Sequence, residues 1–176
     1  DGANFSAPAK TSFTLPWTAT AGVRWAATPA LTLNAQVVRS GWSKNDAIDV
    51  VFAGQSVAVA QNFKDTTAVS VGLDHELSPV WTLRAGVQYD PTPTPDSLRE
   101  PGVFDADRWV YAVGASMVVS QSVTLHGALA YADFSTAPLV DTDVFYGGTP
   151  ASTVAQERGT FGGSGVTASF GANWRF

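Results

Sequence analysis

Few residues in this chain could do acid–base or metal chemistry. It has 176 residues, with two histidines, His75 and His126, and no cysteine. The histidines have opposite parity in alternating segments, so they point to different faces and support no serine–histidine–aspartate arrangement. No cluster of side chains has the spacing of a metal site. The sequence therefore predicts no catalytic residue, no metal, no cofactor and no enzymatic activity.

Two arginines are placed to pair with carboxylates. Arg84 and Arg108 share a parity in neighbouring alternating segments, and Asp90 and Asp107 lie close to them in the sequence. Guanidinium groups bind carboxylates through strong charge-assisted hydrogen bonds. We expect these four residues to form a ladder that fixes an internal network. Contact of the arginines with a ligand is the alternative.

Composition excludes several classes of protein. The formal charge of −5 argues against nucleic acid as a partner, because phosphate binding needs a basic face. No run of about 18 apolar residues encodes a transmembrane helix. The GGSG at 162–165 is no phosphate loop, since neither a lysine nor a helix follows it. No signal peptide is visible, and we expect that an N-terminal part has been removed.

The elements that would position these side chains alternate apolar and polar residues. In the segment 81–90, Trp81, Leu83, Ala85, Val87 and Tyr89 alternate with polar or small residues, which gives a strand with one apolar face. About seven such strands are predicted, near 17–25, 31–37, 69–74, 81–90, 109–119, 123–131 and 166–176.

The strands and their connections are typical of an outer-membrane barrel. Most strands run for about 10 to 14 residues, against about 5 to 6 in globular proteins, and a membrane-spanning strand needs about 9 to 11. Short turns at 27–30, 77–80 and 120–122 alternate with long loops near 44–63, 92–106 and 135–160. Short periplasmic turns and long extracellular loops have this pattern. The predicted fold is an all-β, antiparallel, up-and-down transmembrane β-barrel.

Aromatic residues at the strand ends support this interpretation over a soluble β-sandwich. A sandwich core would not concentrate tryptophan at both ends of its strands, whereas membrane barrels carry aromatic girdles at both interfaces. The candidate interface residues are Trp17, Trp25, Trp81, Tyr89, Trp109, Tyr131, Trp174 and Phe176. The polar face, with most of the arginines, then faces the lumen. Arg39 is an exception with outward parity, placed to reach lipid or lipopolysaccharide headgroups.

Seven strands do not close a single-chain bacterial barrel, which has an even number. The segment 10–16 is short and ends at Pro16, so we interpret it as an extension of the first strand. We therefore expect residues 1–176 to form the C-terminal half of one barrel domain, without its N-terminal plug and first strands.

Several strings resemble a known family. They are TLPWTATAGVRW at 14–25, SGW at 40–42, NFKDTTAVSVGL at 62–73, the stretch 81–115 with YDPTPTPD and DADRW, and the terminal NWRF. Together they resemble the outer-membrane transporters of hydrophobic compounds of the FadL/TodX type. The resemblance implies a barrel of about 14 strands, an even number as closure requires. It also implies a plug and a path for a hydrophobic ligand.

The resemblance also implies a function and partners. The expected function is passive uptake of hydrophobic compounds such as long-chain fatty acids, by a monomer in the bacterial outer membrane. Lys64 is the best candidate to pair with a substrate carboxylate, and neutralisation by a neighbouring acid is the alternative. Phe176 resembles the C-terminal signal read by the outer-membrane assembly machinery. The competing function is an adhesin or structural anchor acting through the extracellular loops.

The proline-rich stretch 89–109 is expected to form a stiff cap at the barrel mouth. Its prolines cannot donate to a sheet ladder, so they end strand pairing above the membrane. Arg99, Asp105, Asp107 and Arg108 are placed to bond across the base of this loop.

Overall fold

The computed structural model describes residues 8–52, 54–99, 105–145 and 148–176, and these residues form an all-β protein. Seven strands make one antiparallel sheet in the order β10-β9-β8-β7-β6-β3-β2. Each wall strand pairs with the next wall strand along the chain, and only the connection from β3 to β6 contains strands of another sheet. The predicted up-and-down wall is therefore confirmed. The wall strands are β2 (Trp17–Thr28), β3 (Leu31–Gly41), β6 (Thr66–Glu76), β7 (Trp81–Asp90), β8 (Arg108–Val118), β9 (Val123–Phe145) and β10 (Thr153–Trp174).

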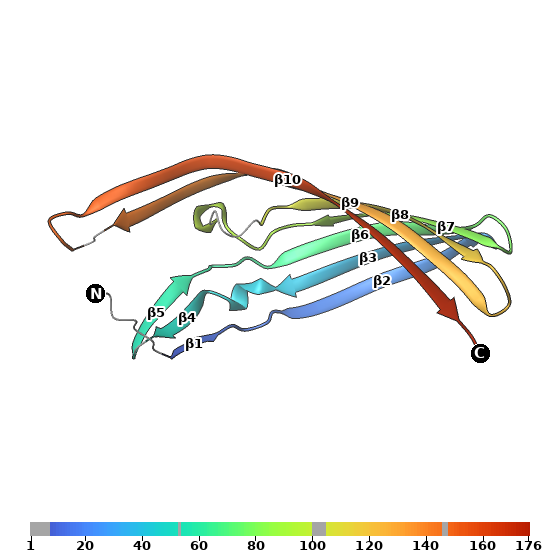
Figure 1. Ribbon diagram of the computed structural model, residues 1–176, viewed down its shortest axis with the longest axis horizontal. Helices are drawn as coiled ribbons and strands as arrows, with labels where there is room; N and C mark the ends of the chain where they lie inside the picture. Colours follow the sequence, from blue (N-terminus) through green and yellow to red (C-terminus); the bar gives the residue numbers. More distant parts are fainter. Residues whose placement is uncertain (1–7, 53, 100–104, 146–147) are drawn as a thin grey trace, which may run out of the picture.

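The described residues contain ten strands rather than seven, because the predicted loop 44–63 contains two strands and residues 9–12 form a third. The two strands in the loop, β4 (Ala47–Phe52) and β5 (Gln55–Ala60), pair with each other, and β4 also pairs with β1 (Ala9–Ser12). This small sheet extends the wall at one end (Figure 1). Of the segment 10–16, which was expected to extend the first strand, only the part within β1 is a strand, and β1 pairs with β4 and is separated from β2.

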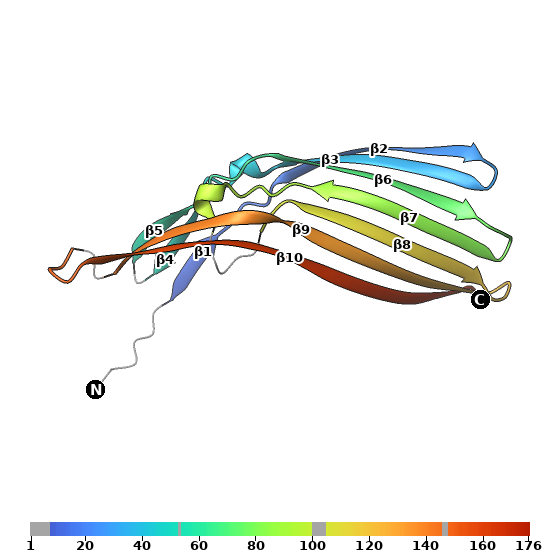
Figure 2. The ribbon, with the colours of Figure 1, turned by 90° about the horizontal axis from the view of Figure 1, so that it is seen from above.

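The wall has short turns at one end and long connections at the other. In both ribbon views, the β2–β3, β6–β7 and β8–β9 turns lie at the end where β10 finishes (Figures 1 and 2). Figure 2 shows the wall as a single curved layer. The predicted alternation of loop lengths is confirmed.

One long loop was predicted wrongly. Residues 135–160 were expected to be irregular, but β9 and β10 continue into them and pair from Thr153 with Phe145 to Trp174 with Val123. A register shift between Phe161 and Gly163 marks where the hairpin leaves the wall. Beyond the wall, strand pairing satisfies the backbone and most described residues of the hairpin are exposed, so no regular amphipathic pattern reveals these strands.

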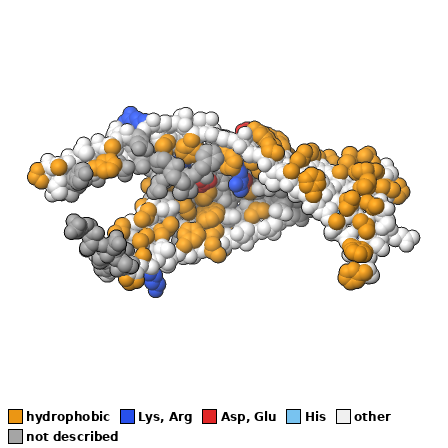
Figure 3. Space-filling model, viewed as in Figure 1, with side chains coloured by type: hydrophobic (Ala, Val, Ile, Leu, Met, Phe, Trp, Pro, Cys, Tyr) orange, Lys and Arg blue, Asp and Glu red, His pale blue; other side chains and the backbone are white. Residues whose placement is uncertain are grey.

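The apolar side chains of the wall point outward. Val71 on β6 pairs with Ala35 on β3 and Val87 on β7, which pairs in turn with Tyr111 on β8, so apolar residues form continuous rows. Val71 is 55% exposed, and the buried apolar residues among those described are only Ala106 and Ala137. Figure 3 shows apolar side chains gathered on the surface near the end of β10. The sheet therefore has no internal core and uses this face to meet lipid.

Candidate functional site

A cavity of about 670 Å³ lies at the end of the wall that carries the long connections. Its inner-face wall comes from alternate residues of three neighbouring strands, among them Val38 on β3, Ala68 on β6 and Gln88 on β7. Loop residues close it. The lining residues are Phe13, Gln36, Val38, Ser40, Trp42, Phe63, Thr66, Ala68, Gln88, Asp90, Pro91, Thr92, Pro93, Asp105, Ala106 and Arg108.

Aromatic rings give this mouth cavity an apolar side. Trp42 belongs to the 3-10 helix η1 (Trp42–Lys44), and Phe63 lies three residues before the start of β6. Their rings meet edge to face, with centroids 5.8 Å apart and planes at 86°. Such pairs are favourable beyond the area that they bury. The cavity thus combines apolar rings with a few polar groups, as ligand pockets do.

The proline-rich loop is fixed over the cavity by two aspartates. Asp107 accepts hydrogen bonds from the Tyr89 hydroxyl at 2.7 Å and the Thr92 N–H at 2.8 Å. Asp105 accepts bonds from the hydroxyls of Thr92 and Thr94, both at 2.5 Å. These bonds join the two arms of the loop across its base, while the stiffness of the cap stays a prediction.

Arg99 ties the same loop to the β9–β10 hairpin. It follows the 3-10 helix η2 (Asp96–Leu98), and its side chain is only 3% exposed. Its guanidinium donates to the Asp105 carbonyl oxygen and to the Asp96 carboxylate, each at 2.6 Å. It also lies over the ring of Phe161 on β10, 5.8 Å from the centroid. The hairpin therefore holds the cap, which sequence analysis did not foresee.

The expected arginine ladder is correct for one pair. Arg108 donates to the Asp90 carboxylate through Nε at 3.1 Å and Nη2 at 2.6 Å. Arg84 instead pairs with Asp74, whose Oδ1 lies 3.0 Å from Nε, because Asp74 on β6 stands directly opposite Arg84 on β7. Asp107 binds the loop and no arginine among the described residues. The four-residue ladder was thus wrong in its partners.

A polar network crosses the inner face below the cavity. Asp74 accepts from Asn34 at 3.0 Å and lies 3.8 Å from Arg24, in addition to its contact with Arg84. Arg84 also donates to the Ser116 hydroxyl at 2.5 Å. Sequence analysis missed Asp74, Asn34 and Ser116, although their shared inward parity was a signal that could have found them.

His126 belongs to the same network. Its Nδ1 lies 2.8 Å from the Ser116 oxygen, so the His126 ring is hydrogen-bonded within the wall. The Ser116 oxygen also accepts from Arg84, and Nε2 of His126 is buried without a partner among the described residues. This arrangement links β8 to β9 on the inner face of the wall.

Lys64 lies at the rim of the cavity but precedes β6 instead of opening it. Its backbone N–H donates to the Pro93 carbonyl at 2.9 Å, which attaches it to the proline-rich loop. The side chain is exposed, and its ammonium has no ion pair within the described residues. The acidic neighbour expected as the alternative to a ligand is therefore not observed there.

Arg39 is paired on the outer side of the mouth. It donates to Thr67 at 2.8 Å and to Asp65 at 3.3 Å. Asp65 also accepts from the Ser43 N–H at 2.9 Å. Hydrogen bonds from Ser43 and the charge of Arg39 hold the pKa of Asp65 below its ordinary value of 3.8. Asp65 thus joins η1 to the wall as an ionised carboxylate.

The candidate interface aromatics lie on the outer face, and most are exposed. Trp25 is 61% exposed, and Trp17, Trp81, Trp109, Tyr131, Trp174 and Phe176 are at least 42% exposed. Tyr89 is half-buried against Trp109, with centroids 5.0 Å apart. Trp17 lies directly over Gly41, where an added Cβ would be 1.9 Å from the indole nitrogen.

Within the described residues, no group of three or more histidines or acids is placed to hold a metal ion. Those residues also include no helix long and apolar enough to span a membrane.

A curved antiparallel sheet with a lipid-facing apolar surface, a polar inner face and a mouth cavity defines the wall of a bacterial outer-membrane β-barrel. The chain belongs to the outer membrane protein transport protein family (OMPP1/FadL/TodX), whose model matches residues 2–176. Members of this family are bacterial outer-membrane proteins.

Solved structures share the fold at low sequence identity. A Pseudomonas aeruginosa FadL homologue matches with a TM-score of 0.82 at 22% identity, over 94% of this chain and 37% of the homologue. The CymD monoaromatic hydrocarbon channel matches with a TM-score of 0.60 at 19% identity, over 95% of this chain and 38% of CymD. The deltaS2 mutant of the TodX monoaromatic hydrocarbon channel matches with a TM-score of 0.63 at 17% identity, over 96% of this chain and 38% of TodX. The chain thus spans little more than a third of these relatives. No curated protein sequence matches it significantly.

Proposed function

We propose that this chain forms the C-terminal half of a barrel that lets hydrophobic compounds enter passively across the outer membrane. The mouth cavity is the observation that carries this function. Its volume of about 670 Å³ falls within the range of about 300 to 1,000 Å³ typical of small-molecule sites. Transport by family relatives supports the same conclusion, since CymD and TodX are named as monoaromatic hydrocarbon channels.

The edges of the wall support a larger barrel. Within the described residues, β2 and β10 each have a neighbouring strand on one side only. Backbone groups left unpaired in lipid cost several kcal/mol each. Further strands that pair with β2 and β10 would satisfy them and close the barrel. A plug inside such a barrel remains a prediction from the family resemblance.

Two kinds of substrate suit different parts of the cavity. The rings of Trp42 and Phe63 suit any hydrophobic compound, including a neutral aromatic one. A long-chain fatty acid also needs a cation for its carboxylate. Arg108 is already paired with Asp90, whereas the Lys64 ammonium is exposed at the rim without a carboxylate partner among the described residues. Lys64 is therefore our candidate for an acidic substrate.

An adhesin or anchor is less consistent with the long β9–β10 hairpin. An adhesive loop would present its surface outward, but this hairpin receives the buried Arg99 and so packs on the cap of the same chain. We interpret the hairpin as part of the structure that shapes the mouth.

Two other partners are proposed from the surface. Phe176 is fully exposed beyond β10, and Trp174 and Phe170 share its outward parity, which suits recognition by the outer-membrane assembly machinery. Arg39 lies at the outer rim, where its partly exposed guanidinium could reach a lipopolysaccharide phosphate in addition to Asp65.

Uptake by cells tests the transport function. The intact protein would be produced in the outer membrane of a strain lacking other hydrophobic-compound channels, and entry of radiolabelled toluene and oleate would be measured. Trp42→Ala with Phe63→Ala should reduce entry of both probes. If each ring contributes about 50 Å² of contact at about 25 cal/mol per Å², the double variant loses about 2.5 kcal/mol of binding, close to two orders of magnitude. Val57→Ala, on exposed β5, is the control. Unchanged entry in the double variant would refute the role of the cavity.

The role of Lys64 is tested separately from transport itself. Lys64→Gln should weaken entry of oleate and leave entry of toluene unchanged, because only oleate carries a carboxylate. Equal loss of both probes, or of neither, would remove Lys64 from the proposal and leave the uptake function standing.

A further inference from the structure

An apolar groove of about 700 Å³ runs along the outer face of the wall, across strands β6 to β10. Its floor consists of small residues, including Ala85, Ala115 and Gly127. Its sides are formed by Leu83 on β7 and by Leu129 and Phe170 on β9 and β10. A Cβ added at Gly127 would lie 3.7 Å from the Phe170 ring, so the ring stands directly beside the floor.

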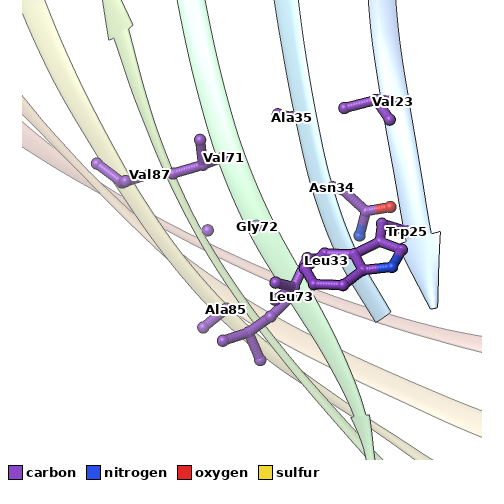
Figure 4. Close-up of a pocket in the computed structure, with 11 residues that line it drawn as sticks. Val23, Trp25, Leu33, Asn34, Ala35, Val71, Gly72, Leu73, Ala85 and Val87 are labelled. Carbon is purple, nitrogen blue, oxygen red and sulfur yellow. The ribbon is translucent and has the colours of Figure 1, made fainter. Parts of the chain in front are cut away.

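The groove contains a histidine that its neighbour on the same face lacks. The adjoining groove, drawn in Figure 4, is formed by apolar side chains such as Trp25, Val71 and Val87, and the two share Leu73 and Ala85. The first groove also contains His75, the penultimate residue of β6. A histidine on a lipid-facing surface of this kind requires an explanation.

The His75 ring has no hydrogen-bond partner within the described residues. Its Nδ1 is buried without a partner, and no described residue bonds to Nε2. A neutral imidazole always carries one N–H donor. An unpaired donor in an apolar environment is unfavourable, and lipid tails offer no acceptor. The ring nitrogen that reaches the surface therefore needs an acceptor from outside the protein.

The position of His75 indicates which part of the membrane supplies that acceptor. His75 stands opposite Leu31 and Leu83, immediately before the short turn at 77–80. Short turns lie at the periplasmic end of outer-membrane barrels. The outer face there meets the periplasmic leaflet, where phosphate groups lie at the level of the aromatic girdle that includes Trp81.

We propose that this groove binds one glycerophospholipid of the periplasmic leaflet. An acyl chain lies over Ala85, Ala115 and Gly127, beside the Phe170 ring. His75 donates a hydrogen bond to the headgroup phosphate. The site is independent of the transport function, since it lies on the opposite face of the wall from the mouth cavity.

Native mass spectrometry of the intact protein tests this site. Protein purified in detergent and stripped of lipid would be titrated with phosphatidylethanolamine and, separately, with diacylglycerol, which lacks the phosphate. Four variants would be compared with the unmodified protein: His75→Leu, His75→Gln, Ala115→Phe and Val166→Phe. The last is the control, because Val166 is 75% exposed on the outer face and does not line the groove. Heat-modifiable migration would confirm that each barrel is folded.

We expect one molecule of phosphatidylethanolamine to bind more tightly than any further molecules of the same lipid. His75→Leu should weaken it about fivefold, the effect of losing one hydrogen bond, and His75→Gln should restore it. Ala115→Phe should abolish it by filling the groove, and Val166→Phe should leave it unchanged. Equal retention in all variants, or equal binding of diacylglycerol, would overturn the proposal.

Discussion

Arg99 offers the most direct test of how the mouth is held together. We consider Arg99→Met, which keeps much of the side-chain volume and removes the guanidinium. In the native protein the guanidinium bonds to the Asp105 carbonyl and the Asp96 carboxylate, and it lies over Phe161. The variant breaks all three contacts and leaves the Asp105 carbonyl without this donor.

The three contacts are not of equal value. A hydrogen bond from a charged donor, with the side chain 3% exposed, contributes about 1.5 to 3 kcal/mol. The cation–π contact adds about 0.5 to 2 kcal/mol. The pair with Asp96 contributes at most about 1 kcal/mol, because the Asp96 side chain is 70% exposed. We therefore expect Arg99→Met to destabilise the closed cap by about 3 kcal/mol, and Asp96→Ala by less than about 1 kcal/mol.

Hydrogen exchange measures this opening at single amides. The Thr92 N–H bonds to the Asp107 carboxylate, and the Ser135 N–H bonds to the Asp107 carbonyl, both at 2.8 Å. A loss of about 3 kcal/mol in the stability of the closed cap should speed hydrogen exchange of these amides by about two orders of magnitude. Amides within β7 should not change, because the wall stays paired. If Asp96→Ala accelerated exchange as much as Arg99→Met, or if neither did, the proposed link between cap and hairpin would be wrong.

Three further predictions concern the wall and its rim. Gly41→Ala should lower the free energy of unfolding by about 1 to 3 kcal/mol, because the indole ring over it must move, whereas Gly159→Ala, with open space around it, should have little effect; urea unfolding in lipid vesicles measures both. In the same assay, Val71→Arg on the lipid face should cost about 2 to 4 kcal/mol and Ser70→Arg on the inner face much less, and equal costs would reverse our assignment of the faces. The contact of Asp65 with η1 should persist above the ordinary carboxyl pKa of 3.8 and be lost as pH falls through the lowered pKa of the folded protein. Tryptophan fluorescence should report this acid transition, and Asp65→Asn should abolish it.

The wall was predictable because the membrane imposes its pattern. Each wall strand has lipid on one side and the lumen on the other, so residues such as Val71 and Ser70 must alternate in type. Short turns then fix which strands are neighbours. The same reasoning gave the inward parity of Arg84 and the outward parity of the aromatic girdle, and the structure confirms both.

The other features of the mouth and of the inner face could not be predicted from the alternation of apolar and polar residues alone. Outside the membrane no alternation imposed by lipid marks β4, β5 or the upper parts of β9 and β10, and most of their described residues are exposed. The pairing of Arg84 with Asp74 depends on the register across the turn at 77–80, which parity alone does not give. The contact of Arg99 with the Phe161 ring joins the proline-rich loop to a strand far from it in the sequence.

The absence of a packed interior also has an evolutionary consequence. Among the described residues only two apolar ones, Ala106 and Ala137, are buried. Away from close contacts such as that of Gly41 with Trp17, a substitution on the outer face replaces one lipid contact by another and needs no compensating change in a neighbouring side chain. Such a wall can accumulate substitutions almost one at a time, provided that apolar and polar residues keep alternating. This explains how a backbone can keep a TM-score of 0.82 to a relative with which it shares 22% of its residues. Selection should instead act most strongly at the mouth, where side chains depend on each other.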